Sequence, residues 1–294
     1  MTLNVTVIIP AYNEESAITD TVKRARAALA ESGCTGEVIV VNDGSTDGTG
    51  ASAAATAVTL INHPTNGGYG RALKSGIRQA KGDWIAIVDA DGSYPIEKLG
   101  ELFSHLPSYD MVVGARQGLS YQGSLLKWQG RKALTSLVRF VTGVAVPDVN
   151  SGMRVFRKSI ALANLDRFSN GFSFTTTLTL AMFNQGHFVK YLPIPYAPRI
   201  GKSKVRMGRD TLRTMQILVM AILAYNPIKL FLALTFLAGI LGFTGVAAVG
   251  LTLGIGAAAF LATLVIFGLF LLFGLGLVCD LLRRPLNKPA RADE

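Results

Sequence analysis

Charged side chains are missing from one long stretch near the end of this 294-residue sequence. From Leu230 to Cys279, 50 consecutive residues include no Asp, Glu, Lys, Arg or His. A helix that spans a membrane needs about 20 apolar residues, so this stretch is long enough for two. A hairpin buried in a soluble core would show a polar stripe at helical spacing, and none is present. The sequence therefore predicts a transmembrane hairpin with helices at about 228–252 and 255–279, joined near Gly250–Gly256.

Signatures of several other protein classes are missing as well. The two cysteines, Cys34 and Cys279, give neither a disulfide framework nor the spacing of a metal site. No G-x-G-x-x-G follows the first expected strand and no Walker lysine loop is found, which argues against dinucleotide and P-loop nucleotide binding. The sequence begins with a strand pattern and shows no cleavable signal peptide. The absence of recognition-helix or zinc patterns argues against nucleic acid as a partner, despite the net charge of +10.

Positive charge is concentrated toward the predicted hairpin. Residues 1–110 hold 8 Lys and Arg against 13 Asp and Glu, whereas residues 111–294 hold 21 against 6. Because Lys and Arg near a spanning helix mark its cytoplasmic ends, we expect both ends of the hairpin, and the residues before it, to be cytoplasmic. The predicted location is a multi-pass protein of the cell inner membrane or an equivalent, with anionic head groups of the bilayer as partners. The flanking basic residues are Lys202, Lys204, Arg206, Arg209 and Arg213 before the hairpin and Arg283, Arg284 and Lys288 after it.

Short β-branched runs alternate with helical patterns through the first part of the sequence. The pattern predicts strands at 5–10, 37–41, 57–62, 83–90 and 110–116, with helices between them. This alternation is typical of an α/β domain with a Rossmann-like, mainly parallel sheet and helices on both faces. We expect the cytosolic domain at 1–209, an amphipathic interface helix at 210–227, the hairpin at 228–280 and a basic cytosolic tail at 281–294.

Polar residues stand where the predicted strands end, which is where ligands bind in such sheets. Asp89 and Asp91 flank Ala90 directly after an apolar strand, so in an extended segment both carboxylates face the same way. Two adjacent carboxylates repel unless a cation neutralises them, and Mg²⁺ or Mn²⁺ prefers such oxygen ligands together with substrate phosphates. Asp43 and Asp91 also precede glycine, and the alternative for either one alone is an ordinary turn former.

With these motifs in place, the sequence resembles the family-2 glycosyltransferases of the GT-A fold, in particular the polyprenyl-phosphate sugar transferases such as the dolichyl-phosphate mannose and glucose synthases. The resemblance covers about residues 5–215 and includes a D-x-D motif. Ser93 departs from the mannose synthases, which usually carry Gln at that position, and this loosens the link to GDP-mannose. The matching stretches are "VIIPAYNEE", "VIVVNDGSTDGT", "NGGYGRALKSGIRQAKGDW", "VDADGSYP", "DMVVGAR", "PDVNSGMRVFRK" and "RIGKSKVR".

The resemblance implies roles for individual residues. Pro10, Tyr12 and Glu14 would line a nucleotide pocket, and Asp43 would hydrogen-bond the base. Asp89, with Ala90 between the acids, would lie near the ribose and the metal, and Asp91 would bind the metal on the diphosphate. Arg116 would meet a phosphate. The donor diphosphate or the lipid phosphate would be covered by Arg199, Lys202 and Lys204.

The implied reaction is metal-dependent and inverting. It moves a hexose from a GDP- or UDP-linked sugar to polyprenyl phosphate. The "ED" pair and Q-x-x-R-W run of the polysaccharide-making relatives are missing, and a phosphate acceptor needs no general base. Two alternatives remain open: transfer to a lipid or glycan hydroxyl, for which Asp148 is the nearby candidate base, and a non-catalytic nucleotide-sugar or lipid-binding partner. The sequence leaves open whether the chain forms a homo-oligomer.

Two amphipathic segments are expected to bring the domain to the bilayer. Ser124–Gly143 has an apolar face and a basic face, and Asp210–Asn226 is similar. Arg131 or Lys132 is the candidate contact for the lipid phosphate, although an ordinary helix packed on the sheet would show the same pattern. The three histidines, His63, His105 and His187, are scattered, and we expect them to have surface or packing roles.

Overall fold

The computed structural model describes residues 2–118, 129, 132, 135–136, 138–140, 142–198, 216, 219, 223 and 227–286. The chain divides into two compact units, Met1–Thr214 and Met215–Glu294. Each unit is described separately below.

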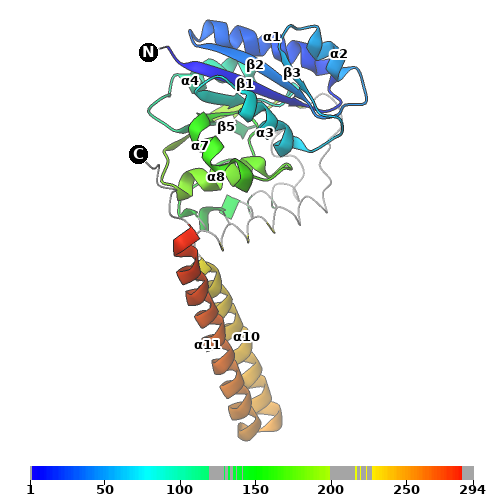
Figure 1. Cartoon of the computed structure of the whole chain (residues 1–294). Coiled ribbons are helices and arrows are strands. Elements are labelled where there is room, and N and C mark those ends of the chain that lie inside the picture. Colours follow the sequence, from blue (N-terminus) through cyan, green and yellow to red (C-terminus); the bar gives the residue numbers. More distant parts are fainter. Residues whose placement is uncertain are drawn as a thin grey trace. The chain divides into compact units, whose positions relative to one another are not determined.

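The first unit is built on a mixed sheet with β1 near its centre (Figure 1). In the described part of the chain the strand order is β3-β2-β1-β4-β6-β5-β7. Only β6 runs antiparallel to its neighbours, β4 and β5, so the prediction of a mainly parallel sheet is confirmed. The strands are β1 (Asn4–Ala11), β2 (Thr35–Asn42), β3 (Thr59–Asn62), β4 (Trp84–Ile87), β5 (Met111–Gln117), β6 (Arg154–Arg157) and β7 (Val189–Pro195).

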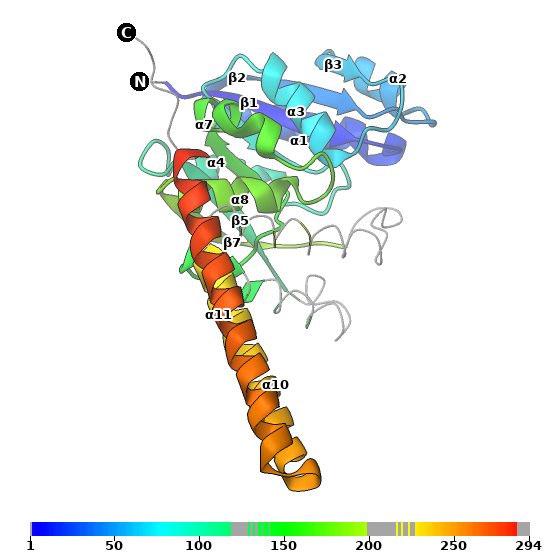
Figure 2. The same cartoon turned by 60° about the horizontal axis from the view of Figure 1, so that its bottom comes forward.

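Helices cover both faces of this sheet (Figures 1 and 2). Alternate residues of β1 show why: Val7 and Ile9 pack in the core beneath α1, whereas Ile8 packs in a second core with α3. Strands buried on both faces become continuous apolar runs, as the sequence shows. The helices are α1 (Glu15–Glu31), α2 (Thr49–Ala54), α3 (Tyr69–Gln79), α4 (Leu99–Phe103), α7 (Lys158–Asn164) and α8 (Phe174–Asn184), with the short 3-10 turns η1 (Ile96–Lys98) and η2 (Leu165–Arg167).

The five predicted strands are all present, although the fourth spans only Trp84–Ile87, and the sheet contains two further strands. The third strand is shorter than expected, beginning at Thr59, because Ala57 takes a left-handed conformation with φ 51°. The strands that sequence patterning missed are β6 and β7. A charged residue at each end of β6 and two prolines in β7 obscure the strand pattern.

The second unit is a pair of long apolar helices, α10 (Pro227–Leu253) and α11 (Ile255–Leu286). An 18-residue window has a mean hydropathy of 2.2 in Pro227–Leu253 and of 2.7 in Ile255–Leu282, and both helices are long enough to cross a membrane. The turn between them is Gly254, whose φ of 89° favours glycine. The predicted pair of apolar helices and the break between them are therefore present, with α11 continuing beyond the expected end. That the pair spans a membrane stays a prediction.

Candidate active site

The carboxyl ends of β1 and β4 meet at the point where the strand order reverses. From β1 the chain proceeds to β2 and β3 on one side and returns to β4 on the other. Open α/β sheets bind ligands outside this position. The structure brings most of the predicted site residues to this edge: Pro10, Tyr12 and Glu14 at the end of β1, Asp43 after β2, Asp89–Asp91 after β4 and Arg116 at the end of β5.

Asp89 is fixed by two elements that lie far from it in the sequence. The hydroxyl of Tyr69, at the start of α3, donates a hydrogen bond to Asp89 Oδ1 at 2.9 Å. Burial raises the pKa of Tyr69 well above its usual value, and the charge of Asp89 adds to that shift, so the phenol keeps the proton that it donates. On the other side, a Cβ placed on Gly152 would lie 2.4 Å from Asp89 Oδ2. The backbone of Gly152 therefore packs directly against this carboxylate.

Asp91 is held within its own loop. Its Oδ1 accepts hydrogen bonds from the N–H and the hydroxyl of Ser93, and Ser93 is fully buried. The carbonyl of Ala90 accepts a hydrogen bond from Thr21 Oγ1 at 3.2 Å, which ties the D-x-D segment to α1. Ser93 thus contacts Asp91 itself, and its hydroxyl is engaged in orienting that carboxylate.

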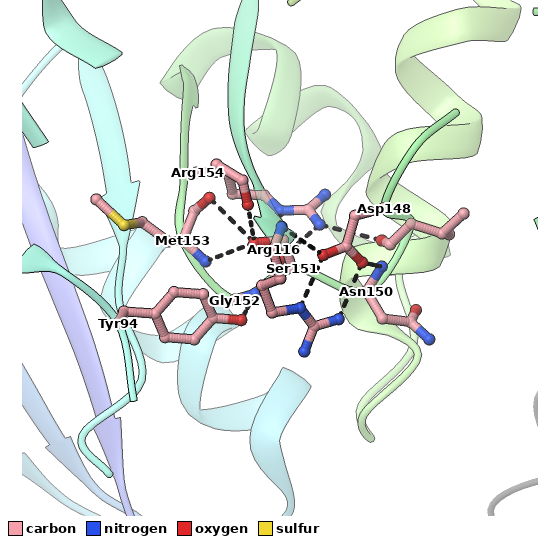
Figure 3. Close-up of polar contacts among 10 residues, drawn as sticks. Tyr94, Arg116, Asp148, Asn150, Ser151, Gly152, Met153 and Arg154 are labelled. Atoms are coloured by element: carbon pink, nitrogen blue, oxygen red, sulfur yellow. Dashed lines mark hydrogen bonds and ion pairs between the residues drawn. The ribbon is translucent and has the colours of Figure 1, made fainter. Parts of the chain in front are cut away.

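A second segment, residues 148–153, lies against the D-x-D segment where Gly152 meets Asp89. Figure 3 shows the contacts of this segment with Tyr94 and Arg116. The N–H of Gly152 donates to the hydroxyl of Tyr94 at 2.7 Å. Tyr94 also packs edge-on against Tyr196, which follows β7. Burial raises the pKa of Tyr94, so it remains a neutral phenol. These contacts fix the distance between residues 148–153 and the D-x-D segment.

Arg116 makes a two-pronged ion pair with Asp148. Its Nε lies 2.7 Å from Asp148 Oδ2, and its Nη2 lies 2.9 Å from Oδ1. The backbone N–H of Arg116 donates to Oδ2 as well, and the Asp148 side chain is only 2% exposed. Burial alone would raise the pKa of Asp148, but the hydrogen bonds and charge of Arg116 outweigh burial and lower it. A carboxylate held this way is a poor proton acceptor, which argues against Asp148 as a general base.

Arg154 is a fully buried cation that sequence patterning missed (Figure 3). Its guanidinium donates to the carbonyls of Val149, Ser151 and Thr175 and to the hydroxyl of Thr179, at 2.6–3.1 Å. Burial lowers the pKa of Arg154, and these acceptors compensate for its lost hydration. An arginine in the middle of the apolar run "MRVF" was the available signal. It holds residues 148–153 to the first turns of α8.

The loops after β1 and β2 are fastened to each other. Asn13 takes a left-handed conformation, with φ 51°. Its side-chain oxygen accepts from the N–H of Thr46 at 2.8 Å, and its own N–H donates to Ser45 Oγ at 3.0 Å. The N–H of Glu14 donates to Thr49 Oγ1 at 2.8 Å. These bonds hold the loop after β1 to the loop after β2.

Asp43 directly follows β2 and is almost fully buried. Its Oδ1 accepts from the N–H of Gly67, and its Oδ2 accepts from the N–H of Gly68. The ring of His63 contacts Oδ1 as well, at 2.6 Å from Nδ1. His63 therefore lies at the predicted site. Its position in the sequence, far from the other site residues, gave no indication of this contact. Contact between Asp43 and a nucleotide base stays a prediction.

The carboxylates fit a hard divalent cation that takes its remaining ligands from phosphate and water. Among the described residues no group of three or more His, Cys, Asp or Glu gathers to enclose a metal. Mg²⁺ in nucleotide sites is held by one or two carboxylates together with substrate oxygens, and Asp89 and Asp91, which both follow β4, would supply these carboxylates. The Tyr69 and Ser93 hydroxyls, bonded to these carboxylates, resemble the outer contacts that orient metal ligands.

Four of the predicted phosphate-binding residues lie outside the described part of the chain: Arg131, Arg199, Lys202 and Lys204. So do most of Ser124–Gly143 and Asp210–Asn226. Lys132 is described and is exposed. The described chain reaches Pro198 beside the D-x-D segment, because the N–H of Ala197 donates to the carbonyl of Ser93 at 3.0 Å. Arg199 follows Pro198 in the sequence.

Comparison with known proteins agrees with this arrangement. The family described as "Glycosyl transferase family 2" matches residues 6–163, which include Asp43, Asp89, Asp91, Arg116 and Asp148. The chain belongs to glycosyl transferase family 2. It is a glycosyltransferase, and the resemblance to the polyprenyl-phosphate branch of the family is confirmed by its relatives.

Three curated relatives of this family-2 glycosyltransferase cover similar parts of it. It is 33% identical over 72% of its length to the low-salt glycan biosynthesis hexosyltransferase Agl6 of Haloferax volcanii, of which it spans 52%. It is 30% identical over 70% of its length to the undecaprenyl-phosphate mannosyltransferase of Micrococcus luteus, of which it spans 89%. It is also 30% identical over 68% of its length to the polyprenol monophosphomannose synthase of Mycolicibacterium smegmatis, of which it spans 80%.

Solved structures of similar fold include glucosyl-3-phosphoglycerate synthase from Mycobacterium tuberculosis. Its complex with Mn²⁺, uridine diphosphate and phosphoglyceric acid matches with a TM-score of 0.61 at 18% identity, covering 74% of this chain and 78% of that one. This likeness shows the GT-A fold of the family-2 glycosyltransferase.

Proposed function

We propose that this glycosyltransferase moves a hexose from a GDP- or UDP-linked sugar to polyprenyl phosphate, with inversion, at the cytosolic face of a membrane. The observation that carries the proposal is the placement of Asp89 and Asp91 outside β4, at the switch point of a family-2 sheet. The names of two relatives, which specify undecaprenyl phosphate and polyprenol, support the acceptor. The apolar helices α10 and α11 support a membrane location.

In the proposed reaction, the bond between the sugar C1 and the donor diphosphate breaks as an oxygen of the acceptor phosphate bonds to C1 from the opposite side. A divalent cation, when bound, stabilises the charge on the departing diphosphate. Asp89 and Asp91 hold that cation, and Tyr69 and Ser93 keep the two carboxylates in position. Positive side chains neutralise the acceptor phosphate, and the candidates are Arg116, Arg131, Lys132, Arg199, Lys202 and Lys204.

The state of Asp148 favours a phosphate acceptor over a hydroxyl acceptor. A sugar or lipid hydroxyl needs a base to remove its proton, and Asp148 was the nearby candidate. Its two oxygens are bound to Arg116, and its pKa is lowered. A phosphate monoester is already anionic near pH 7 and needs no base. Transfer to a hydroxyl is therefore the weaker alternative.

The test uses membranes that contain the full chain. They are incubated with polyprenyl phosphate and a panel of labelled GDP- and UDP-sugars, with Mn²⁺ or Mg²⁺. We expect one donor to give an organic-soluble product that mild acid cleaves, and chelation of the metal to abolish it. A product that resists mild acid would show a hydroxyl acceptor. Binding of a donor without transfer to any acceptor would support the non-catalytic alternative.

Asp91→Asn is the decisive variant in this assay. Removing one metal-binding charge should lower the transfer rate at least about a hundredfold, because a metal contributes several kcal/mol to such a transition state. The matched control is Asp166→Asn, since Asp166 is 97% exposed in η2 and pairs only loosely with Arg78. Full activity in Asp91→Asn would contradict the metal-dependent mechanism.

A further inference from the structure

His63 forms the middle of a hydrogen-bonded chain that ends at Asp43. Its Nδ1 lies 2.6 Å from Asp43 Oδ1, and its Nε2 lies 2.9 Å from the hydroxyl of Ser75 in α3. The side chains of His63 and Asp43 are 13% and 4% exposed. His63 directly follows β3, so its position is set by the sheet, whereas Ser75 belongs to the helix that packs beneath it.

The chemistry of Asp43 fixes which nitrogen of His63 carries a proton. An ionised carboxylate only accepts hydrogen bonds, so the Nδ1 that faces it must be the donor. In a neutral imidazole the other nitrogen then accepts, and the Ser75 hydroxyl can donate to Nε2. The ring of His63 is thus held on both sides: Nδ1 faces Asp43 Oδ1, and Nε2 is hydrogen-bonded to the Ser75 hydroxyl.

The backbone after β3 completes the surroundings of the carboxylate. The N–H of Gly67 donates to Asp43 Oδ1 at 3.0 Å, and the N–H of Gly68 donates to Oδ2 at 2.8 Å. With the His63 bond, Oδ1 has two donors and Oδ2 has one. A carboxylate oxygen can accept about two hydrogen bonds, so one acceptor direction of Oδ2 is left for a ligand.

We propose that His63 is a positioning residue for recognition of the donor nucleotide. By holding the Asp43 carboxylate in one orientation, it keeps an acceptor ready for a base edge that presents an N–H, as uracil and guanine do. Cytosine presents an acceptor at the equivalent ring nitrogen and would be rejected. This inference rests on the proposed function, because it requires a nucleoside diphosphate donor at this edge of the sheet.

The test compares two substitutions of the same residue in the detergent-solubilised full chain. His63→Leu removes both ring nitrogens. His63→Asn keeps an N–H at the same number of bonds from the backbone as Nδ1, so it can still donate to Asp43. Equilibrium binding of UDP, GDP and CDP is measured first, without any acceptor, and the KM and kcat for the sugar donor follow.

We expect His63→Leu to weaken binding of the preferred nucleotide about tenfold, the effect of losing one hydrogen bond to a charged group. Binding of CDP should not change, and kcat at saturating donor should stay within about twofold. His63→Asn should restore most of the affinity. Ser75→Ala should have a smaller effect than His63→Leu, because Ser75 reaches Asp43 only through the ring.

His187→Leu is the matched control. His187 is also paired with an aspartate, at 3.5 Å from Nδ1 to Asp110 Oδ2, but Asp110 immediately precedes β5, at the opposite edge of the sheet. The His187→Leu variant should therefore bind nucleotides with unchanged affinity. Equal losses for UDP, GDP and CDP in His63→Leu, or a fall in kcat with KM unchanged, would overturn the positioning role. A wild-type chain that binds nucleotide but transfers no sugar would contradict the proposed reaction and leave the positioning role of His63 intact. A wild-type chain that binds no nucleotide would overturn both the proposed reaction and the role of His63.

Discussion

At the scale of single residues, Gly152 lies where the site has no room for a side chain. A Cβ there would be 2.4–2.6 Å from the three carboxylate atoms of Asp89, and the φ of Gly152 is not in the left-handed region. The requirement is therefore steric. The residue determines how closely residues 148–153 approach the D-x-D segment.

Gly152→Ala should displace Asp89 and lower the transfer rate at least about tenfold, because small misplacements of a reacting group are costly. The control is Gly100→Ala in α4, where the nearest atom to the new Cβ is Ser32 Cβ at 3.7 Å, an ordinary contact. Rates are compared in the membrane transfer assay, together with the thermal stability of both variants. Wild-type activity in Gly152→Ala would show that Asp89 tolerates displacement.

The Arg116–Asp148 pair leads to a prediction about pH. The pKa of Asp148 is lower in the folded chain than its ordinary value near 4, so the folded state favours the ionised form. The stability that this group contributes is therefore complete above about pH 4 and is lost as the pH falls through the lowered pKa. Asp148→Asn should cost about 3 kcal/mol at pH 7, because it leaves the charge of Arg116 without a partner.

The measurement is the thermal unfolding of wild type and Asp148→Asn in detergent between pH 3 and pH 8. The difference between them should be constant above about pH 5 and should shrink toward pH 3. Asp110→Asn is the control, since its pair with Arg157 is more exposed, at 20% and 39%, and should contribute less. A difference that stays constant down to pH 3 would contradict the assignment.

At the scale of secondary-structure elements, the two apolar helices touch through glycines. A Cβ on Gly242 would lie 2.6 Å from Val265 Cγ1, and one on Gly276 would lie 2.6 Å from Phe231 Cβ. Small residues let helix backbones approach closely in lipid, where packing replaces the hydrophobic effect as the driving force. By contrast, Gly245 has no neighbour within 4 Å of its Cβ position.

Gly242→Leu and Gly276→Leu should separate α10 from α11, whereas Gly245→Leu should not. The measurement is the distance between spin labels at Leu241 and Phe267, both exposed, in a chain without Cys34 and Cys279. We expect a longer and broader distance distribution for the first two variants in lipid bilayers. A distribution unchanged in all three would show that these glycines do not set the helix contact.

Element prediction from the sequence succeeded where one local pattern dominates. Strands β1, β2 and β4 are mostly apolar runs with a polar residue at their end or within two residues after it, and the hairpin is uninterrupted by charge from Leu230 to Cys279. It failed for β6, whose outer residues are arginines. Arg154 is accommodated in the core because the carbonyls of Val149, Ser151 and Thr175 accept its hydrogen bonds. Thr175 lies 21 residues away in the chain, so no local pattern reveals this contact.

At the scale of the whole molecule, the sequence separates two environments along the chain. The first unit carries the family-2 domain and most of the ionisable groups, and the second carries two helices suited to a membrane. The excess of Lys and Arg after residue 110 falls in the part of the chain that leads into the hairpin. This order is what an enzyme acting on a lipid-linked phosphate requires, because its acceptor cannot leave the bilayer surface.

The sequence by itself determined the mainly parallel sheet, the apolar hairpin and the acids after β4. Each of these features depends on residues that are close together in the chain, so the spacing of those residues is enough to predict the feature. Only the tertiary structure decided the partners of those acids. It assigned Asp148 to Arg116, Asp43 to His63 and Asp89 to Tyr69, over separations of 20 to 32 residues. The order of the strands in the sheet decides which charged group or hydrogen-bond donor contacts each carboxylate. Strand order cannot be predicted from any single segment of the sequence.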